Sequence, residues 1–252
     1  MIDLATSSDP ALLALLQKHP GVTAATEGDK LLEFREGESV REVRQADPGA
    51  EVYGLVELID NNPLVCAKSA SIPSPAATMA LIALGPICLA GIALKPPILQ
   101  LNIPAVSADV LGALRALAPI DQLRMITPNE DPTVGGFVEG GLFGRGTLAQ
   151  GLLACQVAVD VPSSYALAEM NALFDERFGR SFFVHRETNA GFFRPENLLG
   201  KPFASYRVGT SKGSSETRVL IEVAADPAGK PGAAGLIHAM NVMAGLEESL
   251  GL

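Results

Sequence analysis

The sequence predicts an α/β or α+β fold. Short apolar runs of strand type, such as Ile98–Ile103, alternate along the chain with helical patterns such as Tyr165–Phe178. Hydrophobic residues make up 48% of the 252 residues and charged residues 19%, a balance that excludes a disordered chain. No segment repeats another. Alternating strands and helices are typical of a sheet covered by helices, and the length predicts one or two closely packed domains.

The first expected helix covers Pro10–Lys18. Asp9 is a favourable N-cap, and a proline in the first turn loses no hydrogen bond there. The helix is expected to end at His19-Pro20-Gly21. The following Glu27–Glu51 is polar and rich in charge, so its pattern is ambiguous, with Leu31–Arg35 as a candidate short strand.

A run without charged residues extends from Ala76 to Leu94, close to the ~20 apolar residues that cross a membrane. Gly85-Pro86 interrupts the run, and Lys95-Pro96-Pro97 ends it without the positive charge asymmetry of membrane proteins. We therefore expect a buried helix over Ala76–Leu84, followed by a turn and a buried strand, and no membrane span.

The second half of the chain continues the alternation. Thr127–Gly146 is rich in glycine, proline and acids, which predicts a long loop. Ser163 and Ser164 are expected to cap the helix over Tyr165–Phe178, on which Leu167, Met170, Leu173 and Phe174 share one face. The other expected elements are strands at Ile98–Ile103, Leu152–Val161, Phe182–Arg186, Ala204–Thr210 and Arg218–Ala225, helices at Ala108–Leu117 and Gly235–Leu250, and a turn at Pro227–Pro231.

Charge and cysteine usage limit the partners and the compartment. The net charge of −9 argues against nucleic acid and anionic membranes as partners, because both favour a basic surface. Cys66, Cys88 and Cys155 are widely spaced and odd in number, which favours buried reduced thiols over disulfides. The N-terminus shows no basic region with an apolar signal core. These features predict a cytoplasmic protein.

Several motifs occur in an order that is similar to that of a known enzyme family. They are Tyr53-Gly54-Leu55-Val56-Glu57-Leu58, Ile72-Pro73-Ser74-Pro75 before an apolar helix, Arg145-Gly146-Thr147-Leu148-Ala149, Gly232-Ala233-Ala234-Gly235, Met240-Asn241 and Gly251-Leu252. In this order the chain resembles N-acetyl-gamma-glutamyl-phosphate reductase, within the aspartate-semialdehyde dehydrogenase superfamily. The resemblance implies a relation to NADP-dependent oxidoreductases of amino-acid biosynthesis that act on an aldehyde or acyl phosphate.

The resemblance also implies a domain organisation. Residues 1–95 would form a reduced remnant of the Rossmann nucleotide-binding domain, with the C-terminal helix 232–252 packed back on it. Residues 96–231 would form a dimerisation domain of the semialdehyde-dehydrogenase type, with a mixed or antiparallel sheet and helices. The expected assembly is a homodimer, or a hetero-oligomer with a related reductase or pathway protein.

The residues that carry the family's chemistry are replaced in this chain. The acylated cysteine of the family falls on Pro75, whose ring cannot attack a carbonyl. The glycine turn that approaches the cofactor pyrophosphate corresponds to Ala5–Pro10, which has no glycine and carries Asp9. No histidine occurs between His19 and His185, where the family has its general base. We therefore expect neither catalytic residues nor a dinucleotide cofactor.

A few residues remain as candidates for ligand binding. Arg145 and Arg194 are candidates for an anion site, and His238 lies on the last helix, which adjoins the cofactor domain in the family. Ser74 adjoins the lost cysteine, but it has no recognisable base and no nucleophile elbow, so a serine at a helix start is favoured. Ala105-Val106-Ser107 resembles the Val-Ser corner that precedes a glycine-rich substrate turn in the family, which makes Ser107 another candidate. Glu130-Asp131 with Glu139 lacks a metal-binding spacing, and no metal is expected.

Three functional hypotheses stay open. The first is a non-catalytic homologue that acts as a dimeric scaffold, a partner subunit or a small-ligand binder. The second is an enzyme with repurposed chemistry in the old cleft. The third is a structural subunit of a complete reductase of the N-acetyl-gamma-glutamyl-phosphate type. Loss of the glycine turn, the cysteine and the histidine together favours the first, because each serves the same mechanism.

Overall fold

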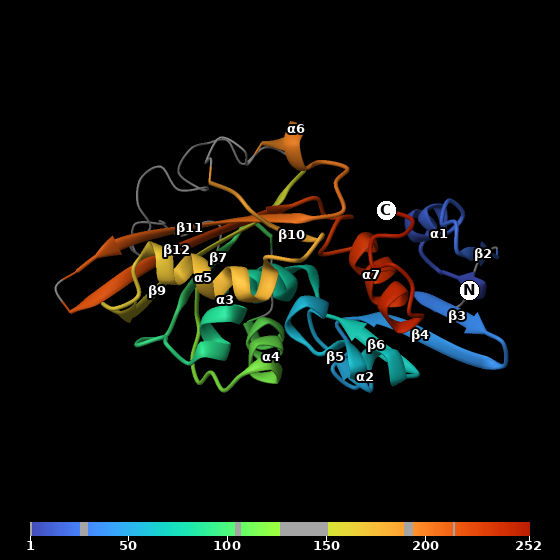
Figure 1. Ribbon diagram of the computed structural model, residues 1–252, viewed down its shortest axis with the longest axis horizontal. Helices are drawn as coiled ribbons and strands as arrows, with labels where there is room; N and C mark the ends of the chain where they lie inside the picture. Colours follow the sequence, from blue (N-terminus) through green and yellow to red (C-terminus); the bar gives the residue numbers. More distant parts are fainter. Residues whose placement is uncertain (1, 26–29, 104–106, 127–150, 189–193, 214) are drawn as a thin grey trace. The chain divides into compact units, whose positions relative to one another are not determined.

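The computed structural model describes residues 2–25, 30–103, 107–126, 151–188, 194–213 and 215–252 (Figure 1). The chain is a mixed α/β protein that divides into two compact units. Residues 1–74 and 232–252 form the first unit, and residues 75–231 form the second. The boundary therefore lies after Ser74, whereas the sequence placed it after Lys95, because the helix that begins at Pro75 packs on the sheet of the second unit.

A mixed six-stranded sheet forms the centre of the first unit. Its strand order is β2-β1-β3-β4-β6-β5, with both parallel and antiparallel neighbours. Phe34 and Val43 face a core that also contains Leu12, Ile237 and Met240. The elements are β1 (Ile2–Thr6), α1 (Pro10–Leu16), β2 (Val22–Ala24), β3 (Leu32–Glu36), β4 (Ser39–Gln45), β5 (Val52–Tyr53), the 3₁₀ turn η1 (Val56–Leu58), α2 (Asn61–Cys66), β6 (Ser69–Ile72) and α7 (Ala233–Met243).

Arg41 joins the helices of the first unit to its sheet. The side chain lies on β4, is buried, and donates hydrogen bonds to the backbone carbonyls of Leu64, Val65, Ala67 and Met243. Three of these carbonyls lie at the end of α2 and one is the last residue of α7. The final carbonyls of a helix have no partner within the helix, so a cationic donor there stabilises both helix ends.

The second unit is built on another mixed six-stranded sheet. Its strand order is β10-β11-β12-β9-β7-β8, and its centre is antiparallel. Its elements are α3 (Pro75–Ala90), β7 (Ile98–Leu101), α4 (Ser107–Leu117), β8 (Arg124–Ile126), β9 (Leu153–Pro162), α5 (Leu167–Phe178), β10 (Val184–Arg186), α6 (Pro195–Leu198), β11 (Ala204–Lys212) and β12 (Glu216–Ala225).

The helix α3 continues through Gly85-Pro86 and does not end before it. The expected turn and strand after Leu84 are therefore wrong. Pro86 has no N–H to donate to the carbonyl four residues earlier, which normally disfavours a helix interior. Here the helix is buried on every side from Ala76 to Cys88, so apolar packing outweighs one missing hydrogen bond. Gly91, with a φ of 64°, ends the turn that follows. No helix among the described residues is long and apolar enough to span a membrane.

The two faces of the second sheet differ. Residues directly opposite each other in neighbouring strands share a face, so Tyr206, Val223 and Cys155 lie on one side. This face is covered by α5, whose Phe174 and Phe178 rings pack against Tyr206 at 5.2 and 5.7 Å between centroids, and by α3, which packs on β9, β12 and α5. Leu198 of α6 packs on Ala154 and Ala224, which belong to the opposite face.

Two helix ends differ from the expectation. The helix α5 begins at Leu167, so Ser163 and Ser164 do not cap it. The carboxylate of Glu169 instead accepts a hydrogen bond from the backbone N–H of Ala166 at 3.1 Å. The last helix ends at Met243, short of Leu250, and Gly245 follows with a φ of 63°. The loop predicted over Thr127–Gly146 lies outside the described residues.

Candidate functional site

The N-terminus of α1 already holds a carboxylate. Asp9 caps this helix, as predicted, and its Oδ1 accepts hydrogen bonds from the backbone N–H groups of Ala11 and Leu12 at 2.7 and 3.0 Å. The Oγ of Ser7 accepts from the N–H of Asp9 at 2.9 Å and donates to the carbonyl of Leu31 at 2.6 Å. The side chains of Ser7 and Asp9 therefore close this turn and occupy two backbone amides at the start of α1.

The turn from β6 into α3 contains Ser74 and Pro75. Pro75 is the first residue of α3, where its fixed φ is compatible with a helix start. Its ring nitrogen is part of the peptide bond and is no nucleophile. Ser74 is half-buried in this turn. The position that follows the strand thus supplies a helix start and no thiol.

Two of the three cysteines, Cys88 and Cys155, lack the surroundings of a reactive thiol. Burial raises the pKa of the Cys88 thiol to about 11, and it raises the pKa of Cys155 further. Reactive cysteines need a positive neighbourhood that lowers the pKa. Cys66 is exposed at the end of α2, so the expectation of a buried thiol is wrong at this position.

His19 has a structural role at the C-terminus of the first unit. Its Nδ1 accepts from the N–H of Gly21 at 3.1 Å, so its Nε2 carries the proton and donates to Oδ1 of Asn241 at 3.0 Å. The amide of Asn241 then donates to the carbonyls of Glu248 and Leu250. A Cβ at Gly251 would lie 2.2 Å from the His19 ring, so the Gly251-Leu252 motif serves this packing.

His238 lies between two carboxylates of the first unit. It is fully buried on α7, with Nε2 at 3.1 Å from Glu248 Oε2 and Nδ1 at 3.9 Å from Glu57 Oε1. Glu57 comes from the Tyr53–Leu58 motif, and His238 lies on the chain between the Gly232–Gly235 and Met240-Asn241 motifs. His238 could be identified from the sequence as a candidate, but Glu57 and Glu248 could not be identified as its partners, because the three residues are far apart along the chain.

Arg194, Ser107 and Arg145 belong to the second unit, whereas His238 belongs to the first. Arg194 is exposed and its Nη1 lies 3.7 Å from Glu196 Oε1. Ser107 is the first residue of α4, but its side chain lies outside the described part of the structure, as does Arg145. Within the described residues no group of three or more His, Cys, Asp or Glu side chains is arranged to hold a metal ion.

A row of polar side chains crosses the second sheet on the face opposite to α3 and α5. Gln100, Gln156, Glu222 and Arg207 lie directly opposite one another on β7, β9, β12 and β11. Arg207 Nε donates to Glu222 Oε2 at 2.7 Å. Both amide atoms of Gln156 and the amide oxygen of Gln100 are buried without a hydrogen-bond partner. Such groups are rare in folded proteins, because a buried amide without a partner is costly.

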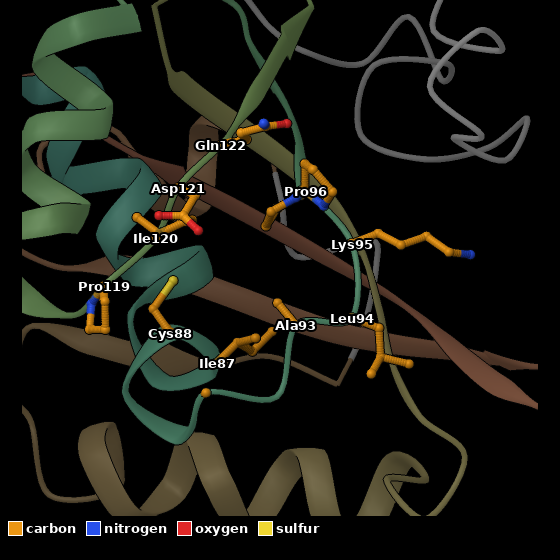
Figure 2. A pocket seen from close by; sticks show the side chains of 12 residues that line it. Ile87, Cys88, Ala93, Leu94, Lys95, Pro96, Pro119, Ile120, Asp121 and Gln122 are labelled. Carbon is orange, nitrogen blue, oxygen red and sulfur yellow. The ribbon is translucent and has the colours of Figure 1, made fainter.

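A cavity of about 420 Å³ lies in the second unit at the end of α3 (Figure 2). Its walls come from the end of this helix, the segment before β7 and the segment between α4 and β8. A second cavity of about 280 Å³ lies beside β11, and a third of about 250 Å³ lies on the polar face of the first sheet. None of these could be predicted, because each combines distant segments of the chain.

Comparison with known proteins adds no assignment. No model of a protein family matches the chain, and no curated protein matches it.

Proposed function

We propose that this protein is a non-catalytic homologue of the NADP-dependent acyl-phosphate reductases that acts as a dimeric scaffold or partner subunit. Two observations support the proposal: the order of the motifs in the sequence, and the residues found at the two positions where reductase chemistry would occur. One is the start of α1, and the other is the start of α3.

The cap of α1 is the observation that carries the proposal. A dinucleotide pyrophosphate is held by free backbone amides at a helix start, helped by the positive end of the helix dipole. In this chain the carboxylate of Asp9 already accepts from two of these amides. A phosphate would have to displace a tethered anion of the same charge, so binding there is strongly disfavoured.

The start of α3 supports the same conclusion. Thioester formation needs a thiol at the position occupied by Pro75, and the chain's own thiols do not substitute for it. The pKa of Cys88 is raised by burial to about 11, which keeps this thiol protonated at neutral pH. Hydride transfer and thioester formation are both required in such a reductase, so neither position alone restores turnover.

A dimer is proposed through the face of the second sheet opposite to α3 and α5. Ile98, Ala158 and Leu220 lie opposite one another on this face and pack together with Ile126. Ile98 and Leu220 are half-buried, and α6 packs at the other end of the face, on Ala154 and Ala224. A second copy related by a two-fold axis would cover the same patch in both chains, and an obligate interface buries roughly 2,000 Å² or more.

The register also shows which positions report on this interface. Val157 and Ile221 are opposite each other on the face that α3 and α5 cover, and both are fully buried. A charge at either position tests folding and does not test association. Leu220 faces the other way, so it is the better interface probe.

Activity measurements test the proposal directly. The wild-type chain and a Pro75→Cys variant are assayed for phosphate-dependent reduction of NADP or NAD with a series of aldehydes. We expect no turnover from either chain, because the variant regains the thiol but not the dinucleotide site. Phosphate-dependent turnover by the wild-type chain would overturn the proposal. Circular dichroism of the variant confirms that it is folded.

A further inference from the structure

The cavity at the end of α3 has the dimensions of a small-molecule site. Its volume of about 420 Å³ falls within the roughly 300–1,000 Å³ that ligand pockets occupy. The walls are Ile87, Cys88 and Gly91 at the end of α3, Ala93–Pro97 before β7, and Pro119–Gln122 between α4 and β8. All of them belong to the second unit, and the cavity is distinct from the positions discussed above.

The backbone around this cavity lacks an N–H group at three positions. Pro96, Pro97 and Pro119 have no N–H group. The N–H of Gly91 donates to the carbonyl of Cys88 at 3.1 Å, and the next N–H donates back to the helix as well. The last turn of α3 contains no basic residue, so the negative end of the helix dipole is not neutralised by the helix itself. This end of the helix therefore disfavours an anionic ligand.

The nearby cations are already engaged. Lys95 Nζ lies 2.7 Å from Glu216 Oε1 and 3.2 Å from Asp160 Oδ2, and Figure 2 shows its side chain pointing away from the cavity. Arg115 donates from its guanidinium to the backbone carbonyls of Ile120 and Asp121 at 3.0 and 2.9 Å. These two hydrogen bonds hold the wall segment in place and occupy the Arg115 guanidinium.

One carboxylate in the lining is available. The side chain of Asp121 is exposed and has no hydrogen bond or ion pair with the described residues. Figure 2 shows it turned toward the cavity, on the side of Ile120 and the Cys88 thiol. The rest of that side is apolar, with Ile87, Ala93 and Ile120. The cavity therefore combines one negative charge with an aliphatic wall.

We propose that this cavity binds an aliphatic ammonium compound, with the ammonium group on Asp121 and the end of α3 and the alkyl body on Ile87 and Ile120. A primary ammonium has three donors and no acceptor, so it can pair with the Asp121 carboxylate. An alkyl chain gains from burial against the apolar wall. The inference does not depend on the proposed function, because it uses none of the same residues.

The probe is hexylammonium, with hexanoate and hexanol as the anionic and neutral compounds of equal chain length. Isothermal titration at low ionic strength is expected to give a saturable heat for hexylammonium, with a dissociation constant of about 1 mM or tighter. Hexanoate and hexanol are expected to bind at least about tenfold more weakly, since a charge-assisted hydrogen bond is roughly twice as strong as a neutral one.

Two variants locate the site. Asp121→Asn keeps the shape and removes the charge, and we expect it to weaken hexylammonium binding about tenfold. The matched control is Asp60→Asn, because Asp60 is also exposed, lies in the first unit and makes no side-chain cap bond.

The titrations give different results if the proposal is right and if it is wrong. Saturable binding of hexylammonium that Asp121→Asn weakens and Asp60→Asn leaves unchanged supports the proposal. Equal or tighter binding of hexanoate would overturn it, and so would an Asp121→Asn chain that binds as well as the wild type. The absence of saturable heat with hexylammonium at millimolar concentration would also overturn it.

Discussion

Replacing Gln156 by methionine is expected to stabilise the protein. Gln156 lies on β9 at the centre of the second sheet and is 1% exposed. Its amide nitrogen and oxygen are buried without a hydrogen-bond partner, and so is the amide oxygen of Gln100 opposite to it. Methionine has nearly the same length and no polar atoms to desolvate, so it fills the space without the cost of the orphaned amide.

The magnitude follows from the desolvation of one buried polar group. A buried donor or acceptor without a partner costs about 1–3 kcal/mol, so Gln156→Met is expected to raise the free energy of unfolding by that amount. In a chain of this size each kcal/mol corresponds to about 2–4 °C, so the thermal midpoint should rise by roughly 2–12 °C. Urea unfolding followed by circular dichroism measures the free energy independently.

The matched control is Gln17→Met, which makes the same replacement at an exposed position after α1. It is expected to change the free energy of unfolding by no more than about 0.5 kcal/mol. A lower thermal midpoint for Gln156→Met would refute the reasoning, because it would show that the amide is hydrogen-bonded in solution. If that loss came with dissociation of a dimer, the second copy would supply the partner.

Three further predictions concern charge and association. Arg41→Met is expected to lower the free energy of unfolding by about 3–5 kcal/mol in urea titrations, because four backbone carbonyls lose their cationic donor. The Arg218 guanidinium holds the pKa of Asp160 below its usual range. Asp160 therefore stabilises the fold above about pH 4, and this effect is lost as the pH falls through its folded pKa. The difference in the free energy of unfolding between wild type and Asp160→Asn should shrink in acid. Multi-angle light scattering should give about twice the chain mass of 26.3 kDa for the wild type. A smaller mass is expected for Leu220→Asp, and the wild-type mass for Leu167→Asp, which lies on the exposed side of α5. A monomeric wild type at micromolar concentration would contradict the proposed interface.

The central strands of the second sheet could be predicted because their residues are strongly apolar. The expected Leu152–Val161 and Arg218–Ala225 agree with β9 and β12 within a few residues. Strand β4 could not be predicted, because the segment Glu27–Glu51 is polar and its pattern is ambiguous. Arg41 points into the protein while Val40 is 44% exposed, the reverse of what hydrophobicity indicates. The four carbonyls that Arg41 serves come from distant parts of the chain, so no local pattern shows them.

The same limit applies to helix α3 and to the candidate sites. Pro86 predicts a helix end from local sterics, and only burial on every side of the helix explains why it continues. Asp9 could be predicted as a cap because the signal is local. The partners of His238 and the lining of the cavity at the end of α3 are assembled by folding from separate segments, so their chemistry is visible only in the structure.

Dinucleotide binding tests the central claim most directly. Isothermal titration of the wild-type chain with NADP and with NAD at millimolar concentration is expected to give no saturable heat, because Asp9 occupies the amides at the start of α1. A saturable heat with micromolar affinity for either dinucleotide would contradict the account, since it would show that the nucleotide site is intact.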